Sequence, residues 1–378
     1  MNKIVIKNKW KLFLTTLLIF SHHFLPAQSS NYSLINKKAT SKTVALYENL
    51  QWYKGKGIMF GHEDDLASGV TWKNEDGRSD IQEVCNDFPA VFGWDVSKIG
   101  IQSTNRDGID FSMMKQWIQL TYKSGGINTL TWLMDNPVSK KNCEEITPAV
   151  TEILPEGNLH EFYKSRLDQF ADFIQELNLG KSENKLIPII FRPFPLGSES
   201  TYWWSENVCS PADYKALWQF TVDYLVETRG LNTLIFAFST DALISKDEFE
   251  KYYPGDEYVD IIGLNIYDSG NQEFVTDLSK KLLILNTIGI DKKKVTAITE
   301  TGYKLIPAND WWTEKLLKGV FRDRNTANIS YLMVGKNISS NHFYAPYPEH
   351  SSAENFKRLY ENMYTLFLED IPDVYVAR

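Results

Sequence analysis

Cysteine is scarce in this chain: only Cys85, Cys143 and Cys209 occur among its 378 residues. Their number is odd and no two share a short spacing. The three cysteines are therefore compatible with one disulfide and one free thiol, and the sequence does not say which two would pair. With 43% hydrophobic residues, a chain of this length buries enough apolar surface to fold without disulfides or a structural metal.

Histidine and the usual cofactor motifs are also scarce. Four histidines follow residue 27, and none has a second histidine or a cysteine at i,i+2 or i,i+4 spacing; they are His62, His160, His342 and His350. No glycine-rich phosphate loop follows an expected strand, and no Gly-x-Ser-x-Gly segment is present. We therefore expect no metal ion and no cofactor, and find little support for a serine or cysteine nucleophile.

A long apolar run is missing as well. The N-terminal run from Leu12 to Phe20 has nine residues, whereas a membrane span needs about twenty. It follows four lysines and precedes Leu25-Pro26-Ala27, which is the order typical of a secretory signal peptide. We predict a signal peptide over residues 1–27, no membrane span, and export to the periplasm or the extracellular space.

Positive charge is in deficit. The formal charge is −8, and loss of the four N-terminal lysines takes it to −12. So acidic a protein is a poor binder of nucleic acid or anionic membranes, but suits a neutral polysaccharide or oligosaccharide. Aromatic residues make up 13%, with 11 Trp and 19 Tyr. They indicate either a large core or a sugar cleft, because flat rings match the apolar faces of sugars.

No linker or repeat interrupts residues 40–378, where short β-branched runs alternate with longer amphipathic stretches. The expected strands are 58–61, 90–95, 126–132, 186–192, 233–238, 259–265, 295–300 and 331–334. The clearest expected helices are 111–123, 159–177, 211–226, 274–286 and 353–367. This alternation predicts an α/β fold, a single-domain (β/α)8 TIM barrel over residues 40–378. We expect a monomer.

Chemistry in such a barrel is expected at the carboxyl ends of the strands. Polar and aromatic residues gather there, namely His62, Asp95, Trp132, Arg192, Asp241, Tyr267 and Glu300. Glu300 ends the run Val-Thr-Ala-Ile-Thr-Glu, so its carboxylate should emerge at the barrel mouth. It is either a glycosidase nucleophile or the partner of an ion pair with Arg192, and position alone favours neither.

Several long segments, in order from about residue 40 to the end, resemble glycoside hydrolase family 26, the β-mannanase family. They are Phe60-Gly61-His62-Glu63-Asp64-Asp65, Arg78-Ser79-Asp80, Pro89 to Asp95, Trp132 with Asn136-Pro137, Arg192-Pro193-Phe194 through Trp203-Trp204, Thr299-Glu300-Thr301-Gly302, and Asn341 to Pro348. The resemblance implies a (β/α)8 fold, a retaining mechanism, and β-1,4-mannan or a related β-glycan as substrate.

Carried over residue by residue, the resemblance makes Glu300 the nucleophile and Tyr267 the tyrosine that orients it. We expect substrate-binding side chains at His62, Asp95, Trp132, Arg192 and Tyr267. Arg192 should lie low in the barrel mouth and hydrogen-bond the site carboxylates. The resemblance favours the cleft edge for at least one of Trp203 and Trp204, with burial behind the fourth strand as the alternative.

The chain departs from the family pattern around the sugar that is cleaved. The family's fourth strand ends in Arg-Pro-aromatic-His-Glu, in which the Glu is the general acid/base, but Pro195 and Leu196 occupy the last two positions here. Leucine cannot donate a proton. Further departures are Leu133 for His, Thr201 for Trp, Asn265 for Asp and Gly335 for Trp.

Loss of a positioned acid costs about 10²- to 10⁴-fold in rate. Glu199 lies three residues beyond Leu196 and is a speculative displaced acid, which would need to stand about 5–5.5 Å from Glu300. Glu206 is a weaker candidate, and both also fit solvated loop carboxylates. Two hypotheses follow: a β-mannanase-like retaining hydrolase, and a non-catalytic polysaccharide-binding protein of the same fold. The family implies an enzyme, and the missing acid is the feature that separates the two hypotheses.

Overall fold

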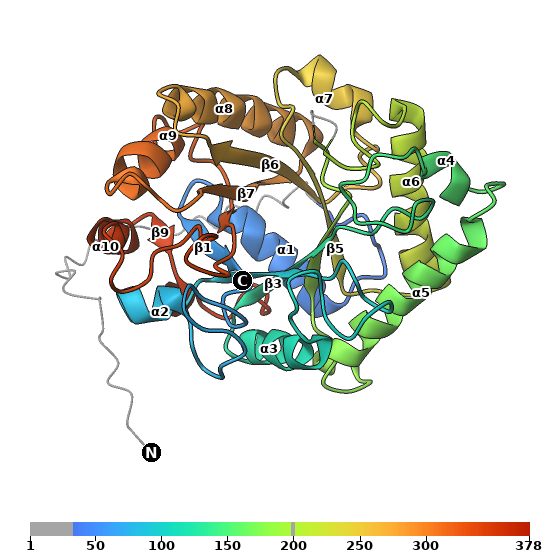
Figure 1. The fold of residues 1–378 in the computed structure, drawn as a ribbon, viewed down its shortest axis with the longest axis horizontal. Coiled ribbons are helices and arrows are strands. Elements are labelled where there is room, and N and C mark those ends of the chain that lie inside the picture. The colour runs from blue at the N-terminus through green and yellow to red at the C-terminus, as the bar shows by residue number, and fades with distance from the viewer. Residues whose placement is uncertain (1–32, 198–200) are drawn as a thin grey trace, which may run out of the picture. The chain divides into compact units, whose positions relative to one another are not determined.

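The computed structural model describes residues 33–197 and 201–378. The predicted signal peptide and Glu199 lie outside these residues. Parallel strands form a central barrel, and helices surround it (Figure 1). The strands of the barrel are β1 (Ile58–Glu63), β2 (Val91–Asp95), β3 (Ile127–Trp132), β4 (Ile189–Pro193), β5 (Leu234–Thr240), β6 (Ile261–Asp268), β7 (Val295–Tyr303) and β8 (Tyr331–Val334).

The barrel is closed by the pairing of its first strand with both neighbours. Each strand from β2 to β8 pairs with the next in parallel, and β1 pairs with both β8 and β2. A ninth short strand, β9 (Thr365–Leu366), pairs with the beginning of β1 and was not predicted. The predicted single-domain (β/α)8 barrel is confirmed, with each expected strand in its place.

The strands form because short β-branched runs suit a sheet that is covered on both faces. In β7 the run Val-Thr-Ala-Ile-Thr is buried throughout, and β3, β4 and β5 are buried along their whole length. One face meets the helices and the other fills the barrel. Only the strand ends are left to carry side chains that meet solvent.

Helices surround the barrel in chain order, apart from the first, which covers one end of it (Figure 1). They are α1 (Ser41–Tyr53), α2 (Asp80–Cys85), α3 (Phe111–Lys123), α4 (Val150–Ile153), α5 (His160–Leu177), α6 (Pro211–Asp223), α7 (Lys246–Tyr252), α8 (Phe274–Lys292), α9 (Lys318–Val320) and α10 (Ala353–Glu361). Two π-helical turns, η2 (Tyr224–Thr228) and η3 (Trp312–Leu317), extend α6 and precede α9. The 3-10 turns η1 (Glu183–Lys185) and η4 (Leu368–Asp370) complete the described elements.

The helix α1 covers the end of the barrel where the strands begin. It starts after Thr40, whose side chain accepts the backbone N–H of Thr43 as an N-cap. The hydroxyl of Tyr47 donates to the carbonyl of Asp260, just before β6, and Ser330, just before β8, donates to the carbonyl of Leu50. With this end covered, the opposite end, where the strands finish, is left for a site.

The structure corrects two expectations. The helix predicted over 353–367 ends at Glu361, and the chain then turns into β9, because the apolar residues beyond Glu361 pair with β1 and the core. The disulfide that the sequence allowed does not form. Cys85, Cys143 and Cys209 are all free thiols, the first two buried and the third half-buried. Of the helices in residues 33–197 and 201–378, none is long and apolar enough to cross a membrane.

Candidate active site

Arg192 lies at the floor of the barrel mouth, near the end of β4, and is 4% exposed. Its Nη1 donates to Glu300 Oε2 at 3.0 Å, and its Nη2 donates to Thr131 Oγ1 at 2.9 Å. Longer contacts of 3.4 and 3.3 Å join Nη1 to Ser239 Oγ and Asn265 Oδ1. One guanidinium therefore links side chains from β3, β5, β6 and β7 and orders the floor of the site.

Glu300 faces into the mouth because β7 carries a bulge. The register of β7 against β6 shifts by one residue immediately before Asn265 pairs with Glu300, and the pairing with β8 shifts at the same place. Thr299 and Glu300 consequently both point inwards: Thr299 Oγ1 lies 2.9 Å from Asn265 Oδ1 while Glu300 binds Arg192. A bulge is a usual device for re-aiming a side chain beside an active site.

Tyr267, two residues beyond Asn265 on β6, hydrogen-bonds Glu300 through its hydroxyl. The side chain is 42% exposed, yet the hydroxyl lies at depth. Burial, followed by the charge of Glu300 and of Glu63, raises the pKa of Tyr267 well above its ordinary value. The phenol therefore stays protonated and donates to the carboxylate. The expected contact between Tyr267 and Glu300 is present.

An aromatic ring lies against Gly335, immediately after β8. A Cβ on Gly335 would stand 3.0 Å from the ring of Tyr344 and 3.5 Å from the hydroxyl of Tyr267. Tyr344 is half-buried and makes an edge contact with Tyr267 at 5.4 Å between centroids. The position where the family pattern has a tryptophan is thus next to a ring that a loop residue supplies.

Sequence reasoning missed a second acidic side chain in the mouth. Glu63, the last residue of β1, points inwards, and its Oε1 lies 3.7 Å from the ammonium of Lys336. Lys336 also forms an ion pair with Asp107 and lies 3.9 Å from Asp64. The signal was the acidic run after His62, but the sequence did not show which of its residues face the barrel.

These charges shift one another's protonation. Burial raises the pKa of Glu63, Lys336 lowers it, and Glu300 and Asp95 raise it again, with a raised pKa as the result. Burial lowers the pKa of Lys336, but the surrounding carboxylates outweigh burial and hold it well above its usual value. The mouth therefore combines a permanently charged cation with a carboxyl group that retains its proton to higher pH than usual.

His62, which we predicted to bind substrate, does not face the mouth. Neighbouring side chains on a strand point to opposite faces, so Glu63 faces the mouth and His62 faces away. The His62 ring is fully buried, and its Nδ1 lies 2.8 Å from Asp65 Oδ1. Asp95 is also buried, at 1% exposure, and its Oδ1 accepts the N–H of Ser97. Burial raises the pKa of Asp95, and the positive charge of Lys336 opposes this rise without cancelling it.

The three tryptophans proposed to line the cleft are all fully buried, so that prediction is wrong for each. Trp132 stacks on Phe170 at 5.5 Å, behind β3 and against α5. Trp203 donates to the carbonyl of Met134, and Trp204 donates to the carbonyl of Pro195. All three rings therefore belong to the core. For Trp203 and Trp204, whose N–H groups are satisfied, burial was the alternative that the sequence had left open.

The position of the family's acid/base is apolar and closed. Leu196 is 2% exposed and belongs to the hydrophobic core. Its N–H donates to the carbonyl of Ser239, and it bridges Thr240 of β5. The backbone beyond β4 is thereby fixed against β5, with no proton-donating side chain at this position.

Of the two displaced-acid candidates, Glu199 lies outside the described residues and Glu206 is half-buried. Burial raises the pKa of Glu206, and its charged neighbours are Asp241, Glu248 and Lys251, so it lies with a different group from Glu300. Tyr202, which sequence reasoning did not single out, does lie near Glu300: burial and that carboxylate raise its pKa.

Within residues 33–197 and 201–378, no three His, Cys, Asp or Glu side chains form a group that could hold a metal ion. The described mouth presents carboxyl groups, at Glu300 and Glu63, and phenols, at Tyr267 and Tyr344. Glu300 is 26% exposed at its side chain and Glu63 is 14% exposed. A carboxylate held by an arginine and a tyrosine beside a second carboxyl group suits nucleophilic and acid–base chemistry.

The chain is similar to known proteins of one family. The model of glycosyl hydrolase family 26 matches residues 35–366. A mannan endo-1,4-beta-mannosidase of Bifidobacterium adolescentis is 29% identical over 288 residues, covering 72% of this chain and 28% of that protein. One from Bacillus subtilis strain 168 is 30% identical over 203 residues, covering 50% of this chain and 52% of that protein. The chain thus spans about half or less of the length of these relatives.

Solved structures resemble the barrel closely. A family 26 β-mannanase from Bacteroides ovatus has a TM-score of 0.85 and 33% identity, and the match covers 90% of this chain and 98% of that one. An endo-beta-1,4-mannanase from Cellulomonas fimi has a TM-score of 0.83 and 28% identity, with 91% of this chain and 79% of that chain covered.

Proposed function

Because this chain belongs to glycosyl hydrolase family 26, we propose that it cleaves β-1,4-mannan or a related β-glycan by a retaining mechanism. One observation carries the proposal. The β7 bulge aims Glu300 into the mouth, where Arg192 binds one carboxylate oxygen at 3.0 Å and the hydroxyl of Tyr267 hydrogen-bonds the same group. Two donors fix the carboxylate in the position from which a nucleophile would attack.

In the proposed first step, a Glu300 oxygen forms a bond to the anomeric carbon as the glycosidic C–O bond breaks. The departing sugar oxygen takes a proton from an acid. In the second step, water loses a proton to the same group and attacks the anomeric carbon, and Glu300 is released as a carboxylate. The anomeric configuration is retained because it is inverted twice.

The proton donor is the open element, because Leu196 cannot serve. Among the described carboxyl groups, Glu63 lies with Glu300 in the mouth and has a raised pKa, which suits an acid. Glu199 remains a candidate on its place in the sequence, and Glu206 is the weakest because its neighbours are Asp241 and Glu248. Single Glu→Gln replacements at these three positions separate them.

A second function has its own supporting observation. The buried, apolar Leu196 leaves the fourth strand without a carboxyl group, which favours a protein that binds the glycan without cleaving it. Such a protein would hold β-glycan through Tyr344, Tyr267 and the charged groups of the mouth. Replacement of Glu300 would then leave binding largely intact.

The deciding experiment is depolymerisation of glucomannan and galactomannan by the purified protein beside Glu300→Ala. Cleavage by the native protein that Glu300→Ala loses supports the hydrolase. Cleavage that survives in Glu300→Ala overturns the mechanism. If neither protein cleaves and both bind β-mannan oligosaccharides equally, the non-catalytic function holds. Circular dichroism of both proteins establishes that they are folded.

We further propose that the protein is exported, through the signal peptide over residues 1–27, and acts as a monomer in the periplasm or outside the cell. Sequencing the N-terminus of protein recovered from a secreting host tests the cut after Ala27. An unprocessed N-terminus in the recovered protein would overturn this proposal. Light scattering of the purified protein tests the monomer.

A further inference from the structure

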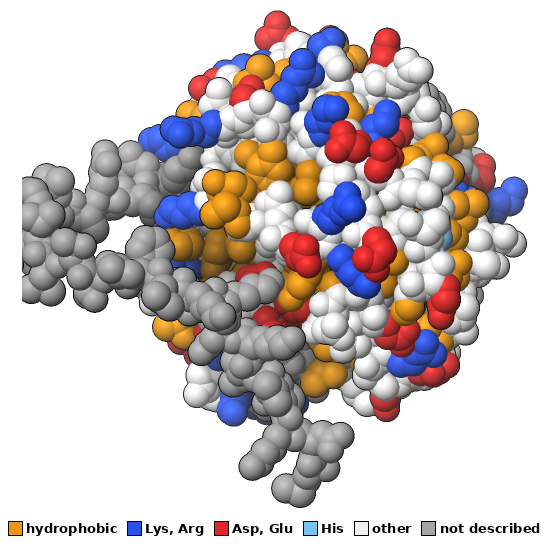
Figure 2. All heavy atoms as spheres, turned by 90° about the vertical axis from the view of Figure 1, so that its left-hand side faces the viewer, with side chains coloured by type: hydrophobic (Ala, Val, Ile, Leu, Met, Phe, Trp, Pro, Cys, Tyr) orange, Lys and Arg blue, Asp and Glu red, His pale blue; other side chains and the backbone are white. Residues whose placement is uncertain are grey.

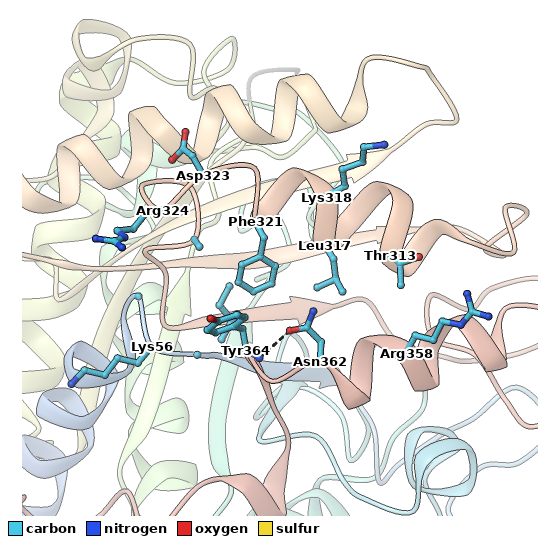
Figure 3. A pocket seen from close by; sticks show the side chains of 14 residues that line it. Lys56, Thr313, Leu317, Lys318, Phe321, Asp323, Arg324, Arg358, Asn362 and Tyr364 are labelled. Carbon is cyan, nitrogen blue, oxygen red and sulfur yellow. Dashed lines mark hydrogen bonds between the residues drawn. The ribbon is translucent and has the colours of Figure 1, made fainter. Parts of the chain in front are cut away.

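A second cavity lies far from Glu300, at the end of the barrel where β1 begins. It has a volume of about 930 Å³ and is lined by the chain before β1, by η3 and α9, by the loop that leads to β8, and by the end of α10 (Figure 3). Ile58 starts β1 at this cavity and Glu63 ends it in the mouth. At about 3.3 Å per residue, the two sites are some 17 Å apart.

The cavity is rich in positive charge. Lys56, Lys318, Arg324 and Arg358 line it, against a single acidic residue, Asp323. The chain as a whole has a net charge of −8, and on the face that Figure 2 shows, acidic and basic side chains are interspersed. The cavity is thus a local concentration of positive charge on an acidic protein, which attracts anions.

Its two arginines are available to a ligand. Within residues 33–197 and 201–378, neither Arg324 nor Arg358 has a hydrogen bond or an ion pair, and both are exposed. Lys318 lies 3.4 Å from Glu314, and Lys56 lies over the ring of Trp52 at 3.6 Å. An unpaired guanidinium beside a cavity is suited to bidentate binding of a carboxylate.

Aromatic rings form the middle of the cavity. Phe321 and Tyr364 stand 5.8 Å apart between centroids, tilted by 42°, and Tyr364 is 47% exposed. In Figure 3 the rings lie between Lys56 and Arg324 on one side and Lys318 and Arg358 on the other. A flat apolar face flanked by cations matches a pyranose ring that carries a negative charge.

We propose that this cavity binds an acidic sugar, a uronic acid unit of a polysaccharide, with its carboxylate on Arg324 or Arg358 and its ring face on Tyr364. The choice of a sugar acid over another anion rests on the proposed function, because a protein that acts on glycans meets its ligands as polysaccharide. The mouth is less suited to this unit, because its two cations, Arg192 and Lys336, are already paired with Glu300 and Asp107.

A matched pair of probes tests the charge of the sugar. β-1,4-linked trimannuronate and β-1,4-mannotriose differ only in the oxidation state of C6. This carbon is a carboxylate in each unit of the first and a hydroxymethyl group in each unit of the second. Calorimetric titration into Glu300→Ala, which removes turnover at the mouth, should give binding of trimannuronate that weakens as salt rises. Removal of both arginines, in Arg324→Ala/Arg358→Ala, should weaken it by about tenfold or more.

Arg322→Ala is the control, because Arg322 is exposed on the same loop but does not line the cavity. It should leave trimannuronate binding within about twofold, whereas Tyr364→Ala should weaken it. Thermal unfolding of each variant checks that the fold is kept. Unchanged mannotriose binding in the double arginine variant shows that the mouth is intact.

The inference is overturned if trimannuronate does not bind, if Arg322→Ala weakens it as much as the double variant does, or if inorganic phosphate competes with equal affinity. These outcomes are separate from failure of the proposed function. Cleavage of glucomannan by the native protein, with no trimannuronate binding, removes the second site alone. Trimannuronate binding without glucomannan cleavage removes the hydrolase alone.

Discussion

Arg192 and Glu300 form an ion pair across the barrel, with Nη1 of the arginine on β4 at 3.0 Å from Oε2 of the glutamate on β7. The arginine side chain is 5% exposed and the glutamate side chain 26%. The sequence had left a nucleophile and an ion-pair partner as alternatives for Glu300. The geometry makes them compatible, because the pair holds one carboxylate oxygen and the other is left for a substrate.

Breaking this pair should be costly. Arg192→Met leaves Glu300 without its buried partner, and we expect a loss of about 3–5 kcal/mol in the free energy of unfolding, measured by urea denaturation. Arg192→Met combined with Glu300→Gln should recover part of the loss, because no unpaired charge remains. Equal stability of the single and double variants would show that the pair is not coupled.

Glu63→Gln should lower glycan cleavage and change its pH dependence. The raised pKa of Glu63 keeps its proton available as pH rises, so loss of this group should remove or shift the alkaline limb of kcat/KM. Pre-steady-state and steady-state rates across the pH range measure this effect. Asp107→Asn, which alters the partner of Lys336 without removing Glu63, is the control.

Leu196→Glu should restore a proton donor at the fourth strand. We expect a gain in cleavage of an unactivated mannan oligosaccharide, up to about 10²-fold, because positioned acid catalysis contributes that much or more. Leu196→Gln has the same shape but no proton to give, and should show no gain. If both replacements changed the cleavage rate equally, the change would come from altered packing and not from proton donation.

Tyr344→Ala and Trp132→Phe should separate sugar contact from core packing. Tyr344 lies against Gly335 at the mouth, so its removal should weaken binding of mannohexaose. Trp132 is fully buried against Phe170, so Trp132→Phe should lower Tm and leave affinity unchanged. Calorimetric binding and thermal unfolding of both variants measure these two effects. Weaker binding in Trp132→Phe, with unchanged binding in Tyr344→Ala, would contradict these roles of the two rings.

The stability of the protein should fall between acid and neutral pH through Asp260. Burial raises its pKa from 3.8 to about 6, although the N–H groups of Phe236 and Ile35 lower it. A raised native pKa stabilises the fold fully below the unfolded value and loses that contribution as pH rises through about 6. The shift corresponds to about 3 kcal/mol. Urea denaturation at pH 4 and pH 7 should show this fall in the native protein and a smaller one in Asp260→Asn.

The strands were predictable because a barrel strand is buried on both faces, and a short β-branched run such as that of β7 signals this directly. The helix α1 was missed because its apolar residues do not form a clear stripe, and polar residues such as Thr43 and Asn49 are among those it buries. The helix expected to reach residue 367 ended early because pairing of Thr365 and Leu366 with β1 overrides helical periodicity.

Site residues were predictable only where position in the strand decided them. Arg192, Tyr267 and Glu300 lie near the carboxyl ends of their strands and reach the mouth. His62 and Glu63 are neighbours, and the sequence does not say which of the two faces inwards. Tryptophans give no sign of direction either, because a core and a sugar cleft both use large rings. Trp132, Trp203 and Trp204 lie in the core, and the aromatic rings at the mouth are those of Tyr267 and Tyr344.

The bulge in β7 also bears on how proteins of this fold differ in length. Thr299 and Glu300 face the same way only because one residue is spare in the pairing with both neighbouring strands. A homologue with a regular seventh strand would reach the same carboxylate with one residue fewer. The resulting gap would fall inside a strand that is buried from Val295 to Thr299, where a deletion would normally disrupt packing. Two homologues whose seventh strands differ by one residue can therefore hold the carboxylate at the same place in the mouth.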